Sequence, residues 1–269
     1  MVPGTSEHRH PFDLSGLTVV VTGGNRGIGL GLARGVARCG ASVCLWARSA
    51  ERNSQAVQEL RNLGANASAV QCDVVDESSV SAAMEMTIRD HGRVDALFAN
   101  AGILGTGYRF VDMPLGEWQQ VIETNLDGAF LCLREAARHM TAAGHPGSLV
   151  CVSSTSAIHG APRREHYASS KAALLALMRG LAVELAPVSI RCNAILPGWT
   201  ETEMFSSSAT GRLKSRAHQR LVEATTRRTP VRRWAKASDF ESVAAFLADP
   251  SISYHTGDAL VVDGGYTIF

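Results

Sequence analysis

The sequence predicts a doubly wound α/β fold, in which helices cover both faces of a parallel sheet of about seven strands. Two observations lead to this prediction. Short apolar segments alternate along the chain with longer amphipathic segments. The 269 residues also contain no internal repeat, low-complexity tract or linker. A single domain over residues 14–269 is therefore expected.

The short apolar segments are the expected strands. Strands of a parallel sheet are buried on both faces, so they form continuous apolar runs instead of alternating patterns. The expected ranges are Leu17–Thr22, Ser42–Ala47, Ala67–Cys72, Ala96–Ala99, Ser148–Ser153, Ser189–Ile195 and Ala259–Val262.

The longer segments between them are the expected helices. Their apolar residues recur at helical spacing in Ala50–Leu63, Glu117–Ala142 and Ala168–Ala186. In the segment between the third and fourth strands, Asp76 is a candidate N-cap and Gly92 a candidate helix end. Local sequence therefore indicates where this helix begins and ends.

The first strand runs directly into a glycine-rich turn, "TGGNRGIG". Glycines here permit a tight turn and a close approach of the backbone to a pyrophosphate, which the N-terminus of the next helix also attracts. The alternative is a glycine-rich turn that binds no ligand. The candidate cofactor-binding residues of this turn are Gly23, Asn25, Arg26, Gly27, Ile28 and Gly29.

Composition excludes several classes of function. The net charge of +1 gives no sign of nucleic-acid binding, and no segment reaches the length of a membrane span. The six cysteines show no CxxC pair and no spacing with histidine that would indicate a metal site. We expect reduced, buried thiols, a cytoplasmic protein and no bound metal.

Two segments depart from the alternating pattern. Residues 1–13 lack the apolar core of a signal peptide and are expected to form a flexible arm. The segment Arg212–Lys236 contains nine lysines and arginines and a single acid, Glu223. With its serine-rich lead-in, it predicts a substrate lid at about residues 200–236.

Several short motifs together resemble the short-chain dehydrogenase/reductase family. They are "TGGNRGIG", "CDV" at 72–74, "NAG" at 100–102, Asn125, "SS" at 153–154, "YASSK" at 167–171, "PGWTET" at 197–202 and "VDGG" at 262–265. The resemblance covers residues 14–267 and implies a Rossmann-type fold. It also implies an oxidoreductase that uses a nicotinamide cofactor to interconvert a carbonyl and a secondary alcohol.

The resemblance assigns further residues to the cofactor. It places Asp73 and Val74 at the adenine, and the segment Asn100, Ala101 and Gly102 under the adenosine ribose. An aspartate after a strand is also a common turn former, so that alternative remains for Asp73. The residues expected around the nicotinamide are Pro197, Gly198, Thr200 and Thr202.

The end of the second strand predicts the choice of cofactor. Ala47 stands where members of the family that prefer NAD usually have an aspartate, and Arg48 follows it. Together with Arg26, Arg48 would bind a 2′-phosphate through two guanidinium groups. We therefore predict NADP(H) over NAD(H), the alternative being that Arg48 simply begins a solvated helix.

Tyr167 and Lys171 stand one helical turn apart, so their side chains share a face. A neighbouring ammonium is expected to lower the pKa of the phenol, which makes Tyr167 the candidate acid and base. Ser154, at the expected end of a strand, is the candidate donor to the substrate oxygen, with Ser153 as its competitor. The resemblance adds Asn125, which supports a water relay to the lysine.

Substrate identity is indicated less directly. The loops of this fold suggest contacts from Ile158, His159, Gly160, Leu104, Tyr108, Trp199 and Phe205. The arginine-rich lid suggests an anionic substrate such as a 3-oxoacyl thioester on a carrier protein, although a solvated basic face is the alternative. A sugar, polyol or steroid-type dehydrogenase is a second possibility, and a catalytically silent dinucleotide-binding regulator is a third. The resemblance further implies a homotetramer.

Overall fold

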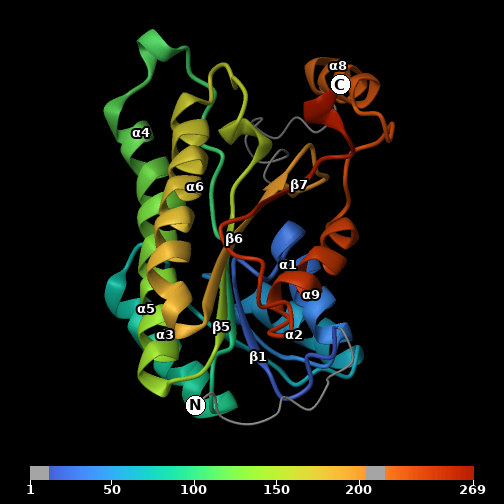
Figure 1. Cartoon of the computed structure of the whole chain (residues 1–269). Coiled ribbons are helices and arrows are strands. Elements are labelled where there is room, and N and C mark those ends of the chain that lie inside the picture. The colour runs from blue at the N-terminus through green and yellow to red at the C-terminus, as the bar shows by residue number, and fades with distance from the viewer. Residues whose placement is uncertain (1–11, 204–215) are drawn as a thin grey trace.

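Within the described residues, a seven-stranded parallel sheet has the order β3-β2-β1-β4-β5-β6-β7, which confirms the predicted fold class (Figure 1). The structure is a computed structural model and describes residues 12–203 and 216–269. The strands are β1 Thr18–Thr22, β2 Ser42–Trp46, β3 Ala67–Val70, β4 Ala96–Ala99, β5 Gly147–Val152, β6 Ile190–Pro197 and β7 Ala259–Val262.

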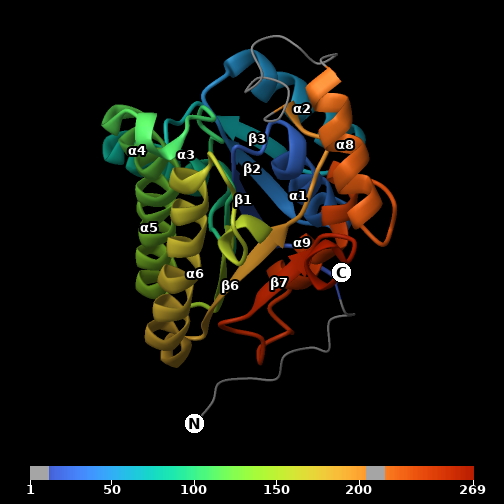
Figure 2. The same cartoon turned by 90° about the horizontal axis from the view of Figure 1, so that it is seen from above.

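Helices cover both faces of this sheet, as Figure 2 shows. They are α1 Gly27–Arg38, α2 Ala50–Asn62, α3 Glu77–His91, α4 Leu115–Ile122, α5 Gly128–Ala143, α6 Glu165–Leu185, α8 Arg216–Arg228 and α9 Glu241–Ala248. Residues of α3, α5 and α6 form one apolar core with the sheet. Residues of α1, α2 and α9 form the other core with the opposite face.

The capping signals of α3 are confirmed. The side chain of Asp76 accepts hydrogen bonds from the backbone N–H groups of Ser78 and Ser79. Gly92 ends the helix in the left-handed conformation, with φ of 80°. Elsewhere the predicted bounds shift by a few residues. Helix α6 begins at Glu165 instead of Ala168, which places Tyr167 within its first turn.

The predicted single helix Glu117–Ala142 is wrong in one respect. The structure has α4 and α5 joined by a π-helical turn, Glu123–Asp127. A π-helical turn inserts one extra residue without interrupting the helix, so apolar periodicity alone does not reveal it. The insertion contains Asn125, whose side chain is fully buried.

The close packing of α1 on the segment before α9 leads to a stability prediction. A Cβ atom at Gly31 would lie 2.0 Å from the backbone oxygen of Ala237. Gly31→Ala is expected to lower the free energy of unfolding by about 1–3 kcal/mol, since two backbones would have to separate. Urea denaturation measures this change.

The matched control is Gly116→Ala, because a Cβ at this position in α4 would meet nothing within 4 Å. It is expected to leave stability unchanged or to raise it by up to about 1 kcal/mol. Equal stability of Gly31→Ala and the wild-type protein would contradict the packing argument.

The remaining predictions concern the cysteines, the ends and the lid. All six cysteines are free, and five of them are buried, while Cys39 is partly exposed. Of the predicted flexible arm, residues 1–11 lie outside the described residues, and Leu14 is fully buried. Of the predicted lid, residues 204–215 likewise lie outside them. No helix in the described ranges is both long and apolar enough to cross a membrane.

Candidate active site

A cleft of about 1200 Å³ runs along the carboxyl ends of the strands. This edge is where ligands of open α/β sheets bind, next to the position where the strand order reverses between β1 and β4. The loops after β1, β2 and β3 line what we call the adenosine half, including Arg26, Arg48 and Asp73. The loops after β4 to β7 line the substrate half, including Leu104, His159, Arg164, Trp199 and Tyr266.

The glycine turn fits a dinucleotide by its lack of side chains. A Cβ atom at Gly29 would lie 2.4 Å from the carbonyl oxygen of Gly23. Gly23 and Gly27 both have positive φ, 61° and 52°. The side chain of Asn100 donates to the carbonyl oxygens of Thr22, at 2.9 Å, and Gly23, at 3.3 Å. The loops after β1 and β4 therefore hold the turn in a shape that only glycine permits at these positions.

Three arginines surround the adenosine half. Arg26 Nη1 lies 2.7 Å from Glu203 Oε2, and Arg52 Nη1 lies 3.2 Å from the same oxygen. The hydrogen bond from Arg26 is the largest cause that lowers the pKa of Glu203. Arg48 is exposed and lines the same part of the cleft. Both guanidinium groups that contact Glu203 are about half exposed, so these ion pairs are weak.

The structure brings all the predicted cofactor residues to this cleft. Those that line it are Gly23, Asn25, Arg26, Gly27, Ile28, Gly29, Arg48, Asp73, Val74, Asn100, Ala101, Gly102, Tyr167, Lys171, Pro197, Gly198, Thr200 and Thr202. Asp73 also accepts a hydrogen bond from the backbone N–H of Val75 at 3.4 Å, which is the turn-forming contact considered as its alternative. The methyl group of Thr202 lies next to Gly27 of the glycine turn.

Helix α6 places Tyr167 and Lys171 on one face, as predicted. Lys171 Nζ lies 5.7 Å from the centroid of the Tyr167 ring. The ammonium is buried and donates to the carbonyl oxygen of Val152 at 2.8 Å, at the end of β5. The helix and the strand end therefore fix the lysine beside the phenol.

The expected lowering of the phenol pKa is not what the structure shows. Burial raises the pKa of Tyr167, although a hydrogen bond with Ser154 and the charge of Arg164 act in the opposite direction. Burial also lowers the pKa of Lys171 to about 8. Helical spacing correctly predicts that Tyr167 and Lys171 lie close together. For the pKa of the phenol, however, desolvation outweighs the effect of neighbouring charges.

The two serines after β5 point in different directions, as strand alternation requires. Ser153 Oγ donates to the backbone oxygen of Lys171 at 2.7 Å and thereby ties the strand to α6. The Ser154 hydroxyl accepts from the N–H of Ser156 at 3.1 Å, and it is the group that hydrogen-bonds Tyr167. Ser154 is thus the serine that lies beside the phenol.

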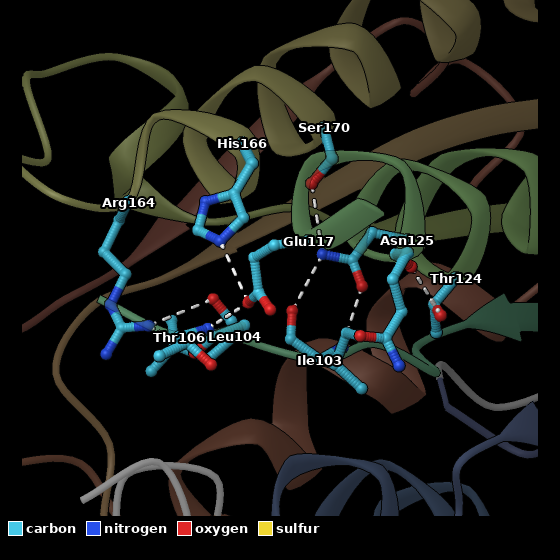
Figure 3. Close-up of polar contacts among 11 residues, drawn as sticks. Ile103, Leu104, Thr106, Glu117, Thr124, Asn125, Arg164, His166 and Ser170 are labelled. Carbon is cyan, nitrogen blue, oxygen red and sulfur yellow. Dashed lines mark hydrogen bonds and ion pairs between the residues drawn. The ribbon is translucent and has the colours of Figure 1, made fainter. Parts of the chain in front are cut away.

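Asn125 lies behind the cleft wall instead of lining it. Its Oδ1 accepts from the N–H of Ile103 at 2.8 Å, and its Nδ2 donates to the Ile103 oxygen at 2.9 Å and to Ser170 Oγ at 3.1 Å (Figure 3). The π-helical turn therefore delivers an amide that fixes the loop after β4 against α6.

The substrate half contains four of the seven residues that the sequence predicts to contact the substrate. Leu104, His159 and Trp199 line the cleft, whereas Phe205 lies outside the described residues. Gly160 also lines it, but Ile158 and Tyr108 do not. The described ranges contain no group of three or more His, Cys, Asp or Glu residues that could hold a metal ion.

Several residues of the cleft were missed by sequence reasoning. Tyr266 stands 6.2 Å from Trp199, which stacks on Trp234 at 5.4 Å between ring centroids. Arg228 covers the Tyr266 ring at 4.4 Å. These contacts join distant segments, so no local pattern indicates them. Arg52 is different, because its position four residues after Arg48, one helical turn away, is a detectable signal.

Comparisons with known proteins agree with this geometry. A family model described as "Enoyl-(Acyl carrier protein) reductase" matches residues 23–267. The L-rhamnose 1-dehydrogenase (NAD(P)(+)) of Sphingomonas sp. (strain SKA58) is 37% identical over 94% of this chain and 96% of its own. A 3-oxoacyl-[acyl-carrier-protein] reductase of Chlamydia pneumoniae is 35% identical over 94% of this chain and 98% of its own.

Solved structures give the same result. An NAD⁺-bound xylitol dehydrogenase has a TM-score of 0.87 and 30% identity, covering 94% of this chain and 99% of its own. An actinorhodin polyketide ketoreductase with NADPH also has a TM-score of 0.87 and 30% identity, over 94% and 98%. These proteins are similar in fold throughout and differ in the cofactor and substrate that their names state.

Proposed function

Since the chain belongs to the short-chain dehydrogenase/reductase family and is an NAD(P)-dependent oxidoreductase acting on CH–OH groups, we propose that it interconverts a carbonyl and a secondary alcohol with NADP(H), using Tyr167 as acid and base. One observation carries this proposal: Ser154, Tyr167 and Lys171 lie together in the same cleft that the glycine turn lines. Turnover of a panel of carbonyls and alcohols with NADPH, NADH and their oxidised forms tests it.

The proton handling follows from the chain's own side chains. When bound, the nicotinamide cofactor supplies or accepts the hydride. In reduction, the Tyr167 hydroxyl donates its proton to the substrate oxygen, and its raised pKa keeps that proton available at neutral pH. The Ser154 hydroxyl donates a hydrogen bond to the same oxygen and stabilises the developing negative charge. In oxidation, Tyr167 accepts the proton instead.

Lys171 and Asn125 support this pair. The Lys171 ammonium, 5.7 Å from the centroid of the Tyr167 ring, would stabilise the ionised phenol and would bind the nicotinamide ribose. Asn125 positions the loop after β4 and α6 through Ile103 and Ser170. The proximity of Thr202 to Gly27 supports a contact with the pyrophosphate, the carboxamide being the alternative. The alternative of a catalytically silent regulator is not retained for this chain.

Preference for NADP(H) is supported by the arginines of the adenosine half. Arg26, Arg48 and Arg52 together provide three guanidinium groups, whereas Ala47 at the end of β2 provides no carboxylate for a ribose 2′-OH. A 2′-phosphate would replace the exposed Glu203 carboxylate as the partner of Arg26 and Arg52. This replacement costs little free energy because the two ion pairs are weak. Arginine forms strong bidentate hydrogen bonds to phosphate.

We predict that Arg48→Ala selectively impairs the use of NADPH. Loss of one charged hydrogen-bond donor to the 2′-phosphate is expected to lower kcat/KM for NADPH by about 10–100-fold, with little change for NADH. Steady-state kinetics with both cofactors measures the ratio. Arg38→Ala, at the other end of α1, is the matched control. It should leave kcat/KM unchanged for both NADPH and NADH. A wild-type preference for NADH, or an equal loss with both cofactors, would contradict the assignment.

Two of the substrate classes expected from the sequence each have separate support within this reaction. A 3-oxoacyl thioester is favoured by the exposed arginines of α8, namely Arg216, Arg220, Arg227 and Arg228, and by the Chlamydia relative. A sugar or polyol is favoured by the aromatic cluster around Trp199 and by the rhamnose dehydrogenase relative. If acetoacetyl thioesters reacted no faster than simple ketones, the thioester proposal would be lost. The steroid-type alternative has no specific support here.

A homotetramer also remains a proposal. Exposed apolar side chains on α6 and at the C-terminal end, such as Val183, Ile268 and Phe269, are suitable for burial between copies. Light scattering of the purified protein should give four times the chain mass. A measured mass equal to that of a single chain at every protein concentration would contradict the proposal.

A further inference from the structure

Arg164 is a cation in the wall of the substrate half, directly before α6. It is partly buried, and its Nη1 donates to the carbonyl oxygens of Leu104, at 3.4 Å, and Gly105 (Figure 3). Its charge acts on Tyr167, so the guanidinium lies within electrostatic range of the proposed reacting centre. The arginine is therefore part of the proposed active site. It belongs to the basic pair Arg163 and Arg164 shortly before Tyr167, which the sequence already offers as a possible addition to the basic lid.

The charge of Arg164 has no close counter-ion within residues 12–203 and 216–269. No carboxylate oxygen there lies within 4.0 Å of its nitrogens. Glu117 is near enough to act on it, but that carboxylate accepts from the N–H of Thr106 and lies 3.6 Å from His166 Nε2. A partly buried cation that contacts only neutral carbonyls is costly, unless an anion binds there.

The surroundings of Arg164 are also suited to an anion. The acids that line the cleft, among the described residues, are Asp73 of the adenosine half and Glu203, which follows β6 but pairs with Arg26 and Arg52 of the adenosine half. Arg228 and His159 line the substrate half. The His159 Nε2 atom is buried and has no protein hydrogen-bond partner in the described part of the chain. Within the described ranges, the cleft wall around Arg164 therefore offers positive charge and a ring nitrogen, and the carboxylates that line the cleft are Asp73 and the Glu203 that pairs with Arg26 and Arg52.

We propose that Arg164 binds a carboxylate of the substrate, so that the natural substrates are hydroxy acids and the corresponding oxo acids. This inference rests on the proposed hydride transfer at Tyr167 and specifies the group that accompanies the reacting carbon. A carboxylate accepts two parallel hydrogen bonds from a guanidinium, whereas the thioester or amide of a neutral substrate accepts weaker ones. Arg164 thereby favours a free acid over a carrier-bound thioester.

A purely structural role for Arg164 makes a different prediction. If the side chain only holds the loop carbonyls of Leu104 and Gly105 against α6, its loss affects every substrate by the same factor. A glutamine can donate to such a carbonyl without carrying charge. Arg164→Gln therefore separates the charge from the structural contact, and Arg164→Lys retains the charge without the planar geometry.

The experiment compares matched acids and esters on the full chain. The substrates are 3-oxobutanoate, 4-oxopentanoate and 5-oxohexanoate, each beside its methyl ester. The distance from carbonyl to carboxylate varies along the series while the methyl ketone is kept, and each ester removes only the charge. We expect the wild-type enzyme to prefer at least one acid to its ester. Arg164→Gln should lower kcat/KM for that acid by about 10–100-fold, mainly by raising KM. It should change kcat/KM for the ester by less than about threefold.

The controls separate the possible outcomes. Arg163→Gln, at the exposed neighbouring residue, should behave as wild type, and Arg164→Lys should retain part of the preference. Binding of NADPH to Arg164→Gln shows whether the variant is folded. Equal use of acid and ester by the wild type, or an equal loss with both in Arg164→Gln, overturns the inference. So does turnover of neutral carbonyls or sugars without turnover of any acid. Failure with every carbonyl and alcohol overturns the proposed function instead.

Discussion

Tyr167→Phe is expected to lower kcat by about 10²–10⁴-fold in both directions, because it removes the group that gives and takes the proton. The phenyl ring retains the packing of α6 on the cleft, and the arginines and glycines of the adenosine half are untouched. Cofactor affinity should therefore stay close to that of wild type. Steady-state kinetics measures the first effect, and quenching of tryptophan fluorescence by NADPH measures the second.

A tyrosine far from chemistry provides the control. Tyr254 is 99% exposed, so Tyr254→Phe should leave both kinetics and cofactor binding unchanged. A loss of kcat smaller than about tenfold in Tyr167→Phe would exclude this phenol as the principal acid. Loss of NADPH binding together with activity would indicate a structural effect of the substitution.

Lys171→Met is expected to slow alcohol oxidation most strongly near neutral pH. Oxidation needs the ionised phenol, which a neighbouring ammonium is expected to stabilise. Removing the ammonium raises the pKa of Tyr167 further, so kcat/KM for oxidation at a fixed neutral pH should fall by about 10–10³-fold. The pH profile of oxidation should move to higher pH, because more alkaline solution is then needed to ionise the phenol.

The wild-type profile follows from the same two groups. The pKa of Tyr167 is raised, so reduction should be nearly constant around neutral pH and fall only in alkaline solution, where the proton donor is lost. Oxidation should rise with pH. The pKa of Lys171 is about 8, so its charge is lost as the pH rises above that value.

Arg179→Met is the control for Lys171→Met, because Arg179 lies on the same helix and is exposed. Its oxidation profile should superimpose on that of wild type. An unshifted profile for Lys171→Met would show that the lysine does not influence the phenol. A fall in rate without any shift would point to cofactor positioning as its main contribution.

Local sequence was sufficient wherever a structural feature depends on residues that are close along the chain. The strand segments, the cap at Asp76, the end at Gly92 and the glycine turn all follow from periodicity or from conformations that few residues adopt. The pairing of Tyr167 with Lys171 follows from helical spacing alone. For the same reason the π-helical turn was missed, since one inserted residue leaves the apolar pattern almost unchanged.

The sequence by itself determined the fold class, the glycine turn and which side chains share a face of α6. Only the tertiary structure decided their environment. It joined Arg26 and Arg52 through Glu203, attached Asn125 to Ile103, and left Arg164 in the cleft wall without a close carboxylate among the described residues. It also raised the pKa of Tyr167 through burial. Hydrogen bonds, ion pairs and desolvation act through space between segments that are far apart in sequence, so no local pattern specifies them.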